Sequence, residues 1–180
     1  MSKKIAILRG INVGGKRKIL MADLRKLFEA LSFTEVSTYI QSGNVFFNTS
    51  LSADNSAIAD QIAAAIKAKY DFDVPVVVRT AAEIEAAIDR NPYLTEEVDI
   101  KQLYLTFLKE TPSDENRKNT ERYEYPPDEF TIIDQEVFLF IPGPSHKSKL
   151  SNNFFENKLK VQATTRNWKT VLKLLELSTI

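Results

Sequence analysis

The chain has 180 residues, in which 24 Lys and Arg balance 24 Asp and Glu, with one His and no Cys. This length suits one domain or two small halves, and it buries enough surface to fold without disulfides or a structural metal. The absence of Cys excludes disulfides, thiolate metal sites and a cysteine nucleophile, and a single His excludes a multi-histidine metal cage. We expect no metal and no cofactor.

No apolar run approaches the roughly 18 residues that a membrane span requires. The first residues lead directly into a strand-like segment, without the apolar core or cleavage site of a signal peptide. The sequence therefore indicates a soluble, cytoplasmic globular protein with no membrane partner. A homo-oligomer is compatible with these features but does not follow from them.

The zero net charge hides an uneven distribution. Residues 1–90 carry 12 basic and 10 acidic side chains, residues 91–144 carry 5 and 12, and residues 145–180 carry 7 and 2. Four acidic residues of the middle segment lie close together in sequence: Glu121, Glu124, Asp128 and Glu129. We interpret them as part of a solvated helix and loop. The basic C-terminal segment is typical of a solvated face, although such a segment can also attract phosphate groups.

Hydrophobic periodicity predicts a strand–helix–strand–strand–helix–strand order in the first half. In chain order the elements are a strand at 4–9, a helix at 20–31, strands at 36–41 and 44–48, a helix after Asp54 and a strand at 74–79. Ser42-Gly43 marks a hairpin, and Pro75 indicates a sheet edge. This is the ferredoxin-like order.

A second round is predicted to follow. Thr80 and Glu83 form a capping box for a helix that stops before Asn91-Pro92. Next come a strand at 103–108, a polar helix after Ser113, strands at 130–133 and 137–141, and a helix around 150–159. The last predicted element is an amphipathic helix with Thr165 as its N-cap and with Trp168, Val171, Leu172, Leu174 and Leu175 on its buried side.

We therefore expect an α+β fold of two ferredoxin-like (βαββαβ-type) halves, residues 1–92 and 93–180. The halves are expected to pack as one compact body, with mainly antiparallel sheets and helices on one side.

Two glycine-bearing turns are predicted to meet at one end of the first sheet. A strand–helix–strand crossover returns parallel and right-handed, so the loop after the first strand and the Ser42-Gly43 hairpin lie at the same end. In this topology the strand at 44–48 neighbours the first strand, which places Asn44 close to Arg9. The residues expected to converge as a ligand-binding site are Arg9, Gly10, Asn12, Gly14, Gly15, Lys16, Gln41, Ser42, Gly43 and Asn44.

Such a cluster suits an anion. Glycines let backbone N–H groups approach a ligand and form a concave nest, and the N-terminus of the following helix adds partial positive charge. Because an exposed helix end contributes only about 0.3–1 kcal/mol, the cations of Lys16, Arg17 and Lys18 would have to supply most of the attraction. The alternative interpretation is a Gly-rich turn that joins a strand to a helix beside solvated basic residues.

Two more specific motifs are disfavoured. Residues 10–16 fit G-x-x-x-x-G-K, but Arg17 occupies the position where a P-loop needs Ser or Thr, and no parallel sheet is expected. An RNA-recognition module would carry stacking aromatics on its third strand, where Phe46 and Phe47 occur. Neighbouring strand residues point to opposite faces, so at least one of these rings belongs to the core.

Candidates outside the two turns are weaker. His146 lies in a basic loop, and a lone His there is more often a surface residue than a catalyst. Ser148 and Lys149 open a helix, either as a cap and a solvated cation or as phosphate contacts. Arg166, in the first turn of the last helix, opposes the helix dipole and indicates a partner anion or carboxylate. Lys149 and Arg166 therefore join the candidate ligand-binding residues, and no catalytic triad or carboxylate dyad can be assembled.

The same segments carry a family resemblance. Residues 9–15 (RGINVGG), 41–44 (QSGN), 148–150 (SKL) and 164–168 (TTRNW) resemble, in order, the hallmark segments of a bacterial family known as domain of unknown function 1697. The resemblance implies a two-part α+β fold with ferredoxin-like halves. It implies no catalysis, cofactor or substrate, so it assigns no catalytic role to any residue.

Three functions are compatible with these observations. The favoured one is a binding module for a phosphate-bearing ligand, a nucleotide or a nucleic acid, at the Gly-rich loop. The neutral overall charge argues for a local site rather than broad coating of nucleic acid. The second is an enzyme acting on a small anionic substrate, for which a general base is missing. The third is a protein-interaction module that pairs through an exposed sheet edge.

Overall fold

The structure is a computed structural model that describes residues 2–180. The chain divides into two compact units: the first comprises the described residues up to Ile84 together with Leu174–Ile180, and the second comprises Glu85–Lys173. Across the described residues, no helix has the length and apolar character needed to cross a membrane.

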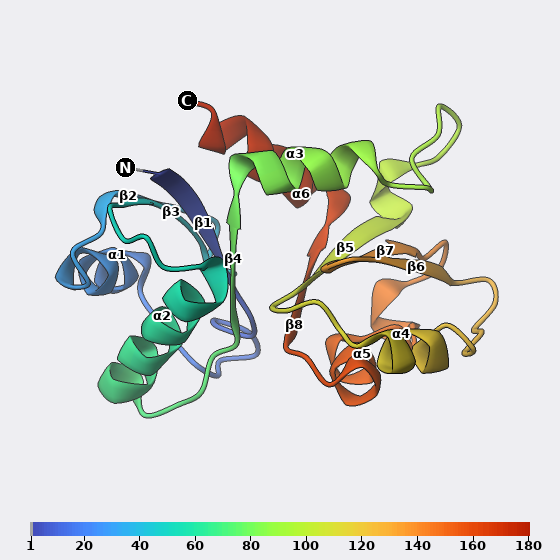
Figure 1. The fold of residues 1–180 in the computed structure, drawn as a ribbon, viewed down its shortest axis with the longest axis horizontal. Helices are drawn as coiled ribbons and strands as arrows, with labels where there is room; N and C mark the ends of the chain where they lie inside the picture. The colour runs from blue at the N-terminus through green and yellow to red at the C-terminus, as the bar shows by residue number, and fades with distance from the viewer. Residues whose placement is uncertain (1) are drawn as a thin grey trace. The chain divides into compact units, whose positions relative to one another are not determined.

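The first unit has the predicted element order. It contains β1 (Ser2–Leu8), α1 (Met21–Ala30), β2 (Thr34–Tyr39), β3 (Asn44–Thr49), α2 (Asn55–Tyr70) and β4 (Val76–Thr80), as Figure 1 shows. Its sheet has the strand order β2-β3-β1-β4, and the neighbouring strands pair antiparallel. β4 therefore lies at an edge of the sheet, as Pro75 predicted. The Asp54 side chain accepts a hydrogen bond from the Ala57 N–H and caps α2.

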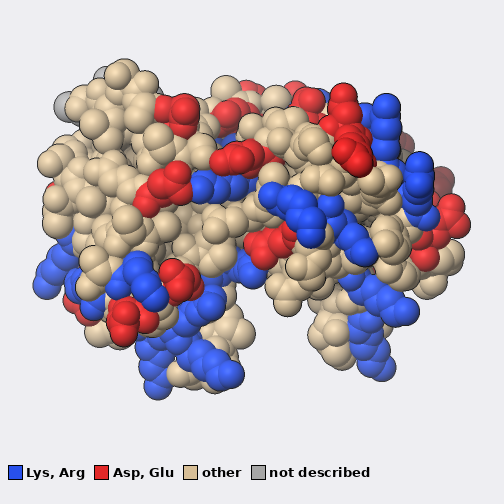
Figure 2. All heavy atoms as spheres, turned by 60° about the horizontal axis from the view of Figure 1, so that its bottom comes forward, with Lys and Arg blue, Asp and Glu red and all other residues tan. Residues whose placement is uncertain are grey.

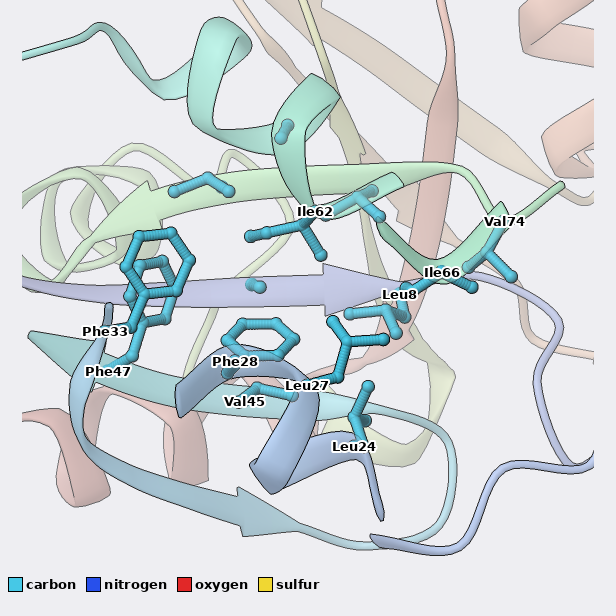
Figure 3. Packing of buried hydrophobic residues seen from close by; sticks show 14 of the residues in the cluster. Leu8, Leu24, Leu27, Phe28, Phe33, Val45, Phe47, Ile62, Ile66 and Val74 are labelled. Carbon is cyan, nitrogen blue, oxygen red and sulfur yellow. The ribbon is translucent and has the colours of Figure 1, made fainter. Parts of the chain in front are cut away.

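The core of this unit lies between one face of the sheet and the helices α1 and α2 (Figure 3). Alternate residues of β1 and β3, including Leu8, Val45 and Phe47, point into it, as the two-residue period of a strand requires. Phe28 of α1 packs edge-on against Phe47 with a centroid separation of 5.4 Å. On the opposite face of β3, Phe46 is also buried. Neither ring of β3 is therefore available to stack on a nucleic-acid base.

The second unit repeats the order of the first. It contains β5 (Leu103–Leu108), α4 (Asp114–Thr120), β6 (Glu129–Ile133), β7 (Glu136–Phe140), α5 (Asn152–Leu159) and β8 (Ala163–Asn167). The strand order β6-β7-β5-β8 matches that of the first sheet element for element, again with antiparallel pairs. Phe155 and Leu159 of α5 pack on the sheet face that carries Leu108, Val137 and Leu139.

β8 corrects the sequence prediction for residues 164–167. Thr164, Thr165 and Arg166 do not begin the last helix but pair with β5, with Arg166 opposite Leu105. Thr165 is therefore not an N-cap: its hydroxyl contacts Thr106 Oγ1 at 2.7 Å and donates to Asn152 Oδ1. The cap is Asn167, whose Oδ1 accepts from the Thr170 N–H.

One helix begins immediately after the last strand of each sheet. α3 (Ala81–Asp89) follows β4, and α6 (Trp168–Ser178) follows β8. The predicted capping box at the start of α3 is present, because Glu83 accepts from the Thr80 N–H at 2.7 Å and Thr80 Oγ1 accepts from the Glu83 N–H. On α6, Trp168 is buried as predicted, whereas Leu172 is exposed, contrary to the predicted buried stripe.

Candidate functional site

The loop after β1 forms a small projecting hairpin. The Asn12 N–H donates to the Arg17 carbonyl at 3.1 Å and the Lys16 N–H donates to the Val13 carbonyl at 3.0 Å, so Gly14 and Gly15 form a two-residue turn. Both glycines have positive φ, at 58° and 74°. Positive φ at both central residues defines a type I′ turn, which Gly-Gly adopts without steric cost. We call residues 12–17 the Gly-Gly hairpin.

The side chain of Asn12 fixes this hairpin to the rest of the unit. Its Nδ2 donates to the carbonyls of Ile19 and Gln41, both at 2.9 Å, and its Oδ1 accepts from the Ile19 N–H at 2.9 Å. One amide thus uses its donors and its acceptor to join three segments of backbone. Asn also tolerates the φ of 56° found here better than most residues.

The two glycine-bearing turns meet, as the topology predicted. The Leu8 N–H donates to the Gly43 carbonyl at 2.9 Å, and Asn44 of β3 pairs with Ile7 of β1. Gly43 has φ +89°, and a Cβ there would lie 2.7 Å from Ile11 Cδ1 and 2.9 Å from Leu8 Cβ. Glycine is therefore required at position 43 by backbone conformation and by packing.

The candidate residues of these turns differ in accessibility. Gly10, Gly14, Gly15, Lys16 and Gln41 are exposed; Arg9, Asn12 and Ser42 are half-buried; Gly43 and Asn44 are buried. Asn44 Nδ2 donates to the Tyr39 carbonyl, and the Arg9 N–H donates to the Pro75 carbonyl. Asn12, Gly43 and Asn44 thus support the two turns structurally, whereas the Gly-Gly turn and Lys16 are accessible to solvent.

The accessible part combines N–H donors with cations. Within residues 2–180, the N–H groups of Gly14 and Gly15 donate to no protein acceptor, and the space where a Cβ would stand is open at both. Lys16, Arg17 and Lys18 are all exposed. α1 begins only at Met21, and its N-cap Leu20 makes no side-chain capping bond. Together with the antiparallel sheet, this late start excludes a P-loop.

Three apolar side chains, one in the Gly-Gly hairpin and two in neighbouring segments, are exposed, which the sequence did not predict. Val13, Leu20 and Ile40 are 63%, 71% and 47% exposed. Val13 follows Asn12 in the sequence. Leu20 and Ile40 are the sequence neighbours of Ile19 and Gln41, whose backbone carbonyls accept hydrogen bonds from the Asn12 side chain. The sequence shows them as isolated hydrophobic residues in turns, but it shows neither their exposure nor the hydrogen bonds that join the backbone segments they belong to.

Lys149 and Arg166 belong to the second unit. Lys149 is exposed, with its Nζ 5.3 Å from the centroid of the Tyr125 ring, and it precedes α5 rather than opening it, because Ser151 is the N-cap. Arg166 is buried in β8, where it donates to Thr164 Oγ1 and to the Thr165 carbonyl. Burial lowers the pKa of Arg166 to about 10, so its guanidinium stays charged at neutral pH.

His146 and Ser148, the other residues singled out in the sequence, lie in loops of the second unit. His146 is exposed in a short 3-10 turn at Ser145–Lys147. Ser148 Oγ donates to Asp128 Oδ2 at 2.7 Å and accepts from the Leu150 N–H, so it ties two loops together. Among the residues that the structure describes, no group of three or more His, Cys, Asp or Glu could hold a metal ion. Figure 2 shows both signs of charge on the face it displays.

The fold and the site define an α+β protein of two four-stranded antiparallel sheets with the same strand order, carrying an exposed basic hairpin after its first strand. The chain belongs to the family described as Protein of unknown function (DUF1697), whose model matches residues 1–138. The segments 148–150 and 164–168 lie beyond that match.

One solved structure is similar over nearly the whole chain. The conserved bacterial protein SP0830 from Streptococcus pneumoniae superimposes with a TM-score of 0.78 at 24% sequence identity, and the match covers 98% of each chain. At this identity the likeness establishes the fold alone. A comparison with curated proteins gave no match.

Proposed function

We propose that the protein binds the phosphate groups of a nucleotide or nucleic acid at the Gly-Gly hairpin. The observation that carries the proposal is the fixed turn itself: two glycine N–H groups without protein acceptors beside Lys16 and Arg17. Backbone N–H groups and cations are the donors that phosphate oxygens use in proteins. Because Asn12 holds the hairpin through three hydrogen bonds, little conformational entropy is lost when a ligand binds.

The exposed apolar neighbours favour a nucleic acid over a free nucleotide. Val13, Leu20 and Ile40 offer apolar contacts beside the cations, and single-stranded nucleic acids present sugars and unstacked bases next to their phosphates. A projecting hairpin also reaches the backbone of a polymer more readily than it surrounds a small molecule. The proposed ligand is therefore a single strand whose phosphates contact Lys16, Arg17 and the glycine N–H groups.

The test is a titration of fluorescent oligonucleotides and of ATP against three proteins. We expect wild type to bind a single strand more tightly than ATP, and Lys16→Ala/Arg17→Ala to bind it about tenfold or more weakly. The control is Lys26→Ala/Lys69→Ala, which removes two exposed lysines from α1 and α2 and lowers the net charge equally. Equal weakening by both double variants would contradict a local site.

A second variant tests the contribution of the glycine N–H groups to binding separately from that of the cations. Gly14→Asn keeps a residue pair, Asn-Gly, that prefers the same type I′ turn, but it adds a side chain over the turn. We expect unchanged stability and weaker oligonucleotide binding. Unchanged binding by Gly14→Asn would show that the ligand does not approach the glycine backbone.

A further inference from the structure

The acidic segment of the second unit borders a cavity of about 480 Å³. This volume lies within the range of small-ligand sites. The cavity lies beside the loop that joins α4 to β6. Its walls are aromatic rings and carboxylates, with two prolines, and no Lys or Arg is among its lining residues. The aromatic residues are Tyr93, Tyr123, Tyr125 and Phe130.

The aromatic walls are held in place by contacts outside the cavity. The Tyr93 hydroxyl contacts Thr131 Oγ1 at 2.8 Å, and the Tyr93 ring stacks on Phe140. The rings of Tyr123 and Tyr125 each meet Phe154 edge-to-face at a centroid separation of 5.6 Å. These rings therefore have little rotamer freedom to lose when a ligand enters.

The negative charge of the carboxylates that line the cavity is only partly compensated. Glu121 forms an ion pair with Arg117 at 3.0 Å, and Asp128 accepts from Ser148. Within residues 2–180, Glu124 and Glu129 form no ion pair. Burial raises the pKa of Tyr93, and the negative charge of Glu129 adds to that rise.

The two tyrosine rings beside the cavity already bind cations from the same chain. Lys158 Nζ donates a hydrogen bond to the Tyr123 hydroxyl at 2.7 Å and lies 4.5 Å from the centroid of that ring, and Lys149 Nζ lies 5.3 Å from the centroid of Tyr125. Neither lysine lines the cavity. Both tyrosines thus already have a cation next to them, and the face of an aromatic ring attracts positive charge.

We propose that this cavity binds an organic cation, an alkylammonium or guanidinium group, between the tyrosine rings and the carboxylates of Glu124 and Glu129. The cation belongs either to a free polyamine or to a Lys or Arg side chain of a peptide, because both present the same chemistry. The inference is independent of the Gly-Gly hairpin, which lies in the other unit and attracts the opposite charge.

Calorimetric titration with N-acetyl-arginine amide, spermidine and N-acetyl-citrulline amide tests the proposal. Citrulline has nearly the shape of arginine without its charge, so we expect the two cations to bind and citrulline amide not to bind. Tighter binding of arginine amide than spermidine assigns the site to a peptide side chain, and the reverse order assigns it to a polyamine. Equal affinity for citrulline and arginine amides, or no heat from either cation at 10 mM and low salt, would overturn the proposal.

Variants locate the binding. Glu124→Gln/Glu129→Gln should weaken cation binding about tenfold, because it removes the unpaired charges. The control Glu96→Gln/Glu97→Gln removes two exposed carboxylates of the same unit that do not line the cavity, and it should bind as wild type does. Tyr123→Leu should weaken binding, and Tyr123→Phe, which keeps the ring, should not. Equal effects of the two glutamate double variants would place the cation elsewhere.

Discussion

Asn12 is the residue on which the geometry of the candidate site depends. It lies in the segment between β1 and α1, and its side chain forms hydrogen bonds to backbone groups of Ile19 and Gln41. The sequence predicted that the two glycine-bearing turns meet, because crossover handedness follows from element order. It did not predict the role of Asn12, because a bond from a side chain to a carbonyl 29 positions away depends on the finished fold.

Substitution of Asn12 should loosen the hairpin. Asn12→Ala removes three hydrogen bonds and replaces a residue that tolerates a φ of 56° with one that tolerates it less, so we expect a loss of about 2–4 kcal/mol in the free energy of unfolding. Asn12→Gly removes the same bonds without the conformational cost and should lose less. Urea denaturation followed by far-UV circular dichroism, which reports on the helices and strands of both units, measures both losses. Equal stability of Asn12→Ala and wild type would show that the bonds do not hold the loop.

Two glycine positions should respond differently to the same substitution. Gly43→Ala introduces a Cβ within 3 Å of Ile11 and Leu8 at positive φ, so a loss of about 2–4 kcal/mol is expected. Gly14→Ala has open space and incurs only the conformational cost, about 1 kcal/mol. The same urea denaturation measures the difference. If Gly14→Ala were the more destabilised variant, the turn geometry described for the two sites would be wrong.

The elements themselves were largely predictable, with one informative failure. Apolar periodicity and caps such as Asp54, Thr80 and Ser113 located the helices, because these signals are local. β8 was missed because Thr164 and Arg166 are buried polar residues, so the segment lacks the apolar pattern of a strand. Its pairing with β5 and the contact between Thr106 and Thr165 compensate for that polarity, and neither is visible in a linear sequence.

The junction between β4 and α3 allows a prediction about the stability that Glu83 provides. Glu83 accepts from the Thr80 N–H and from Asn55 Nδ2, and Asn55 Oδ1 accepts from the buried Lys4 Nζ. Glu83→Ala should therefore cost about 2–3 kcal/mol, since it leaves the half-buried Thr80 N–H and Asn55 Nδ2 without this acceptor. Asn167→Ala, at the equivalent joint before α6, removes one capping bond and should cost about 1 kcal/mol. Chemical denaturation compares them, and equal losses would argue against a network around Glu83.

At the scale of the whole molecule, equal numbers of basic and acidic residues limit electrostatic binding to local sites. If Lys16, Arg17 and Lys18 are the phosphate contacts, the logarithm of the binding constant for a single strand should fall with the logarithm of salt concentration with a slope of about −2. Lys16→Ala/Arg17→Ala should reduce the slope to about −0.7. A wild-type slope steeper than about −5 would mean that many more cations take part.

The division of the chain has a consequence for how the protein is made. Leu174–Ile180 completes the first unit, and the Lys3 ammonium donates to the Ile180 carbonyl, although 177 positions separate them. Synthesis reaches Leu174–Ile180 only after the whole second unit has been made. The strands and helices of the first unit therefore remain incompletely covered until then, and a deletion of Leu174–Ile180 should destabilise that unit although these residues are far from the rest of it in sequence.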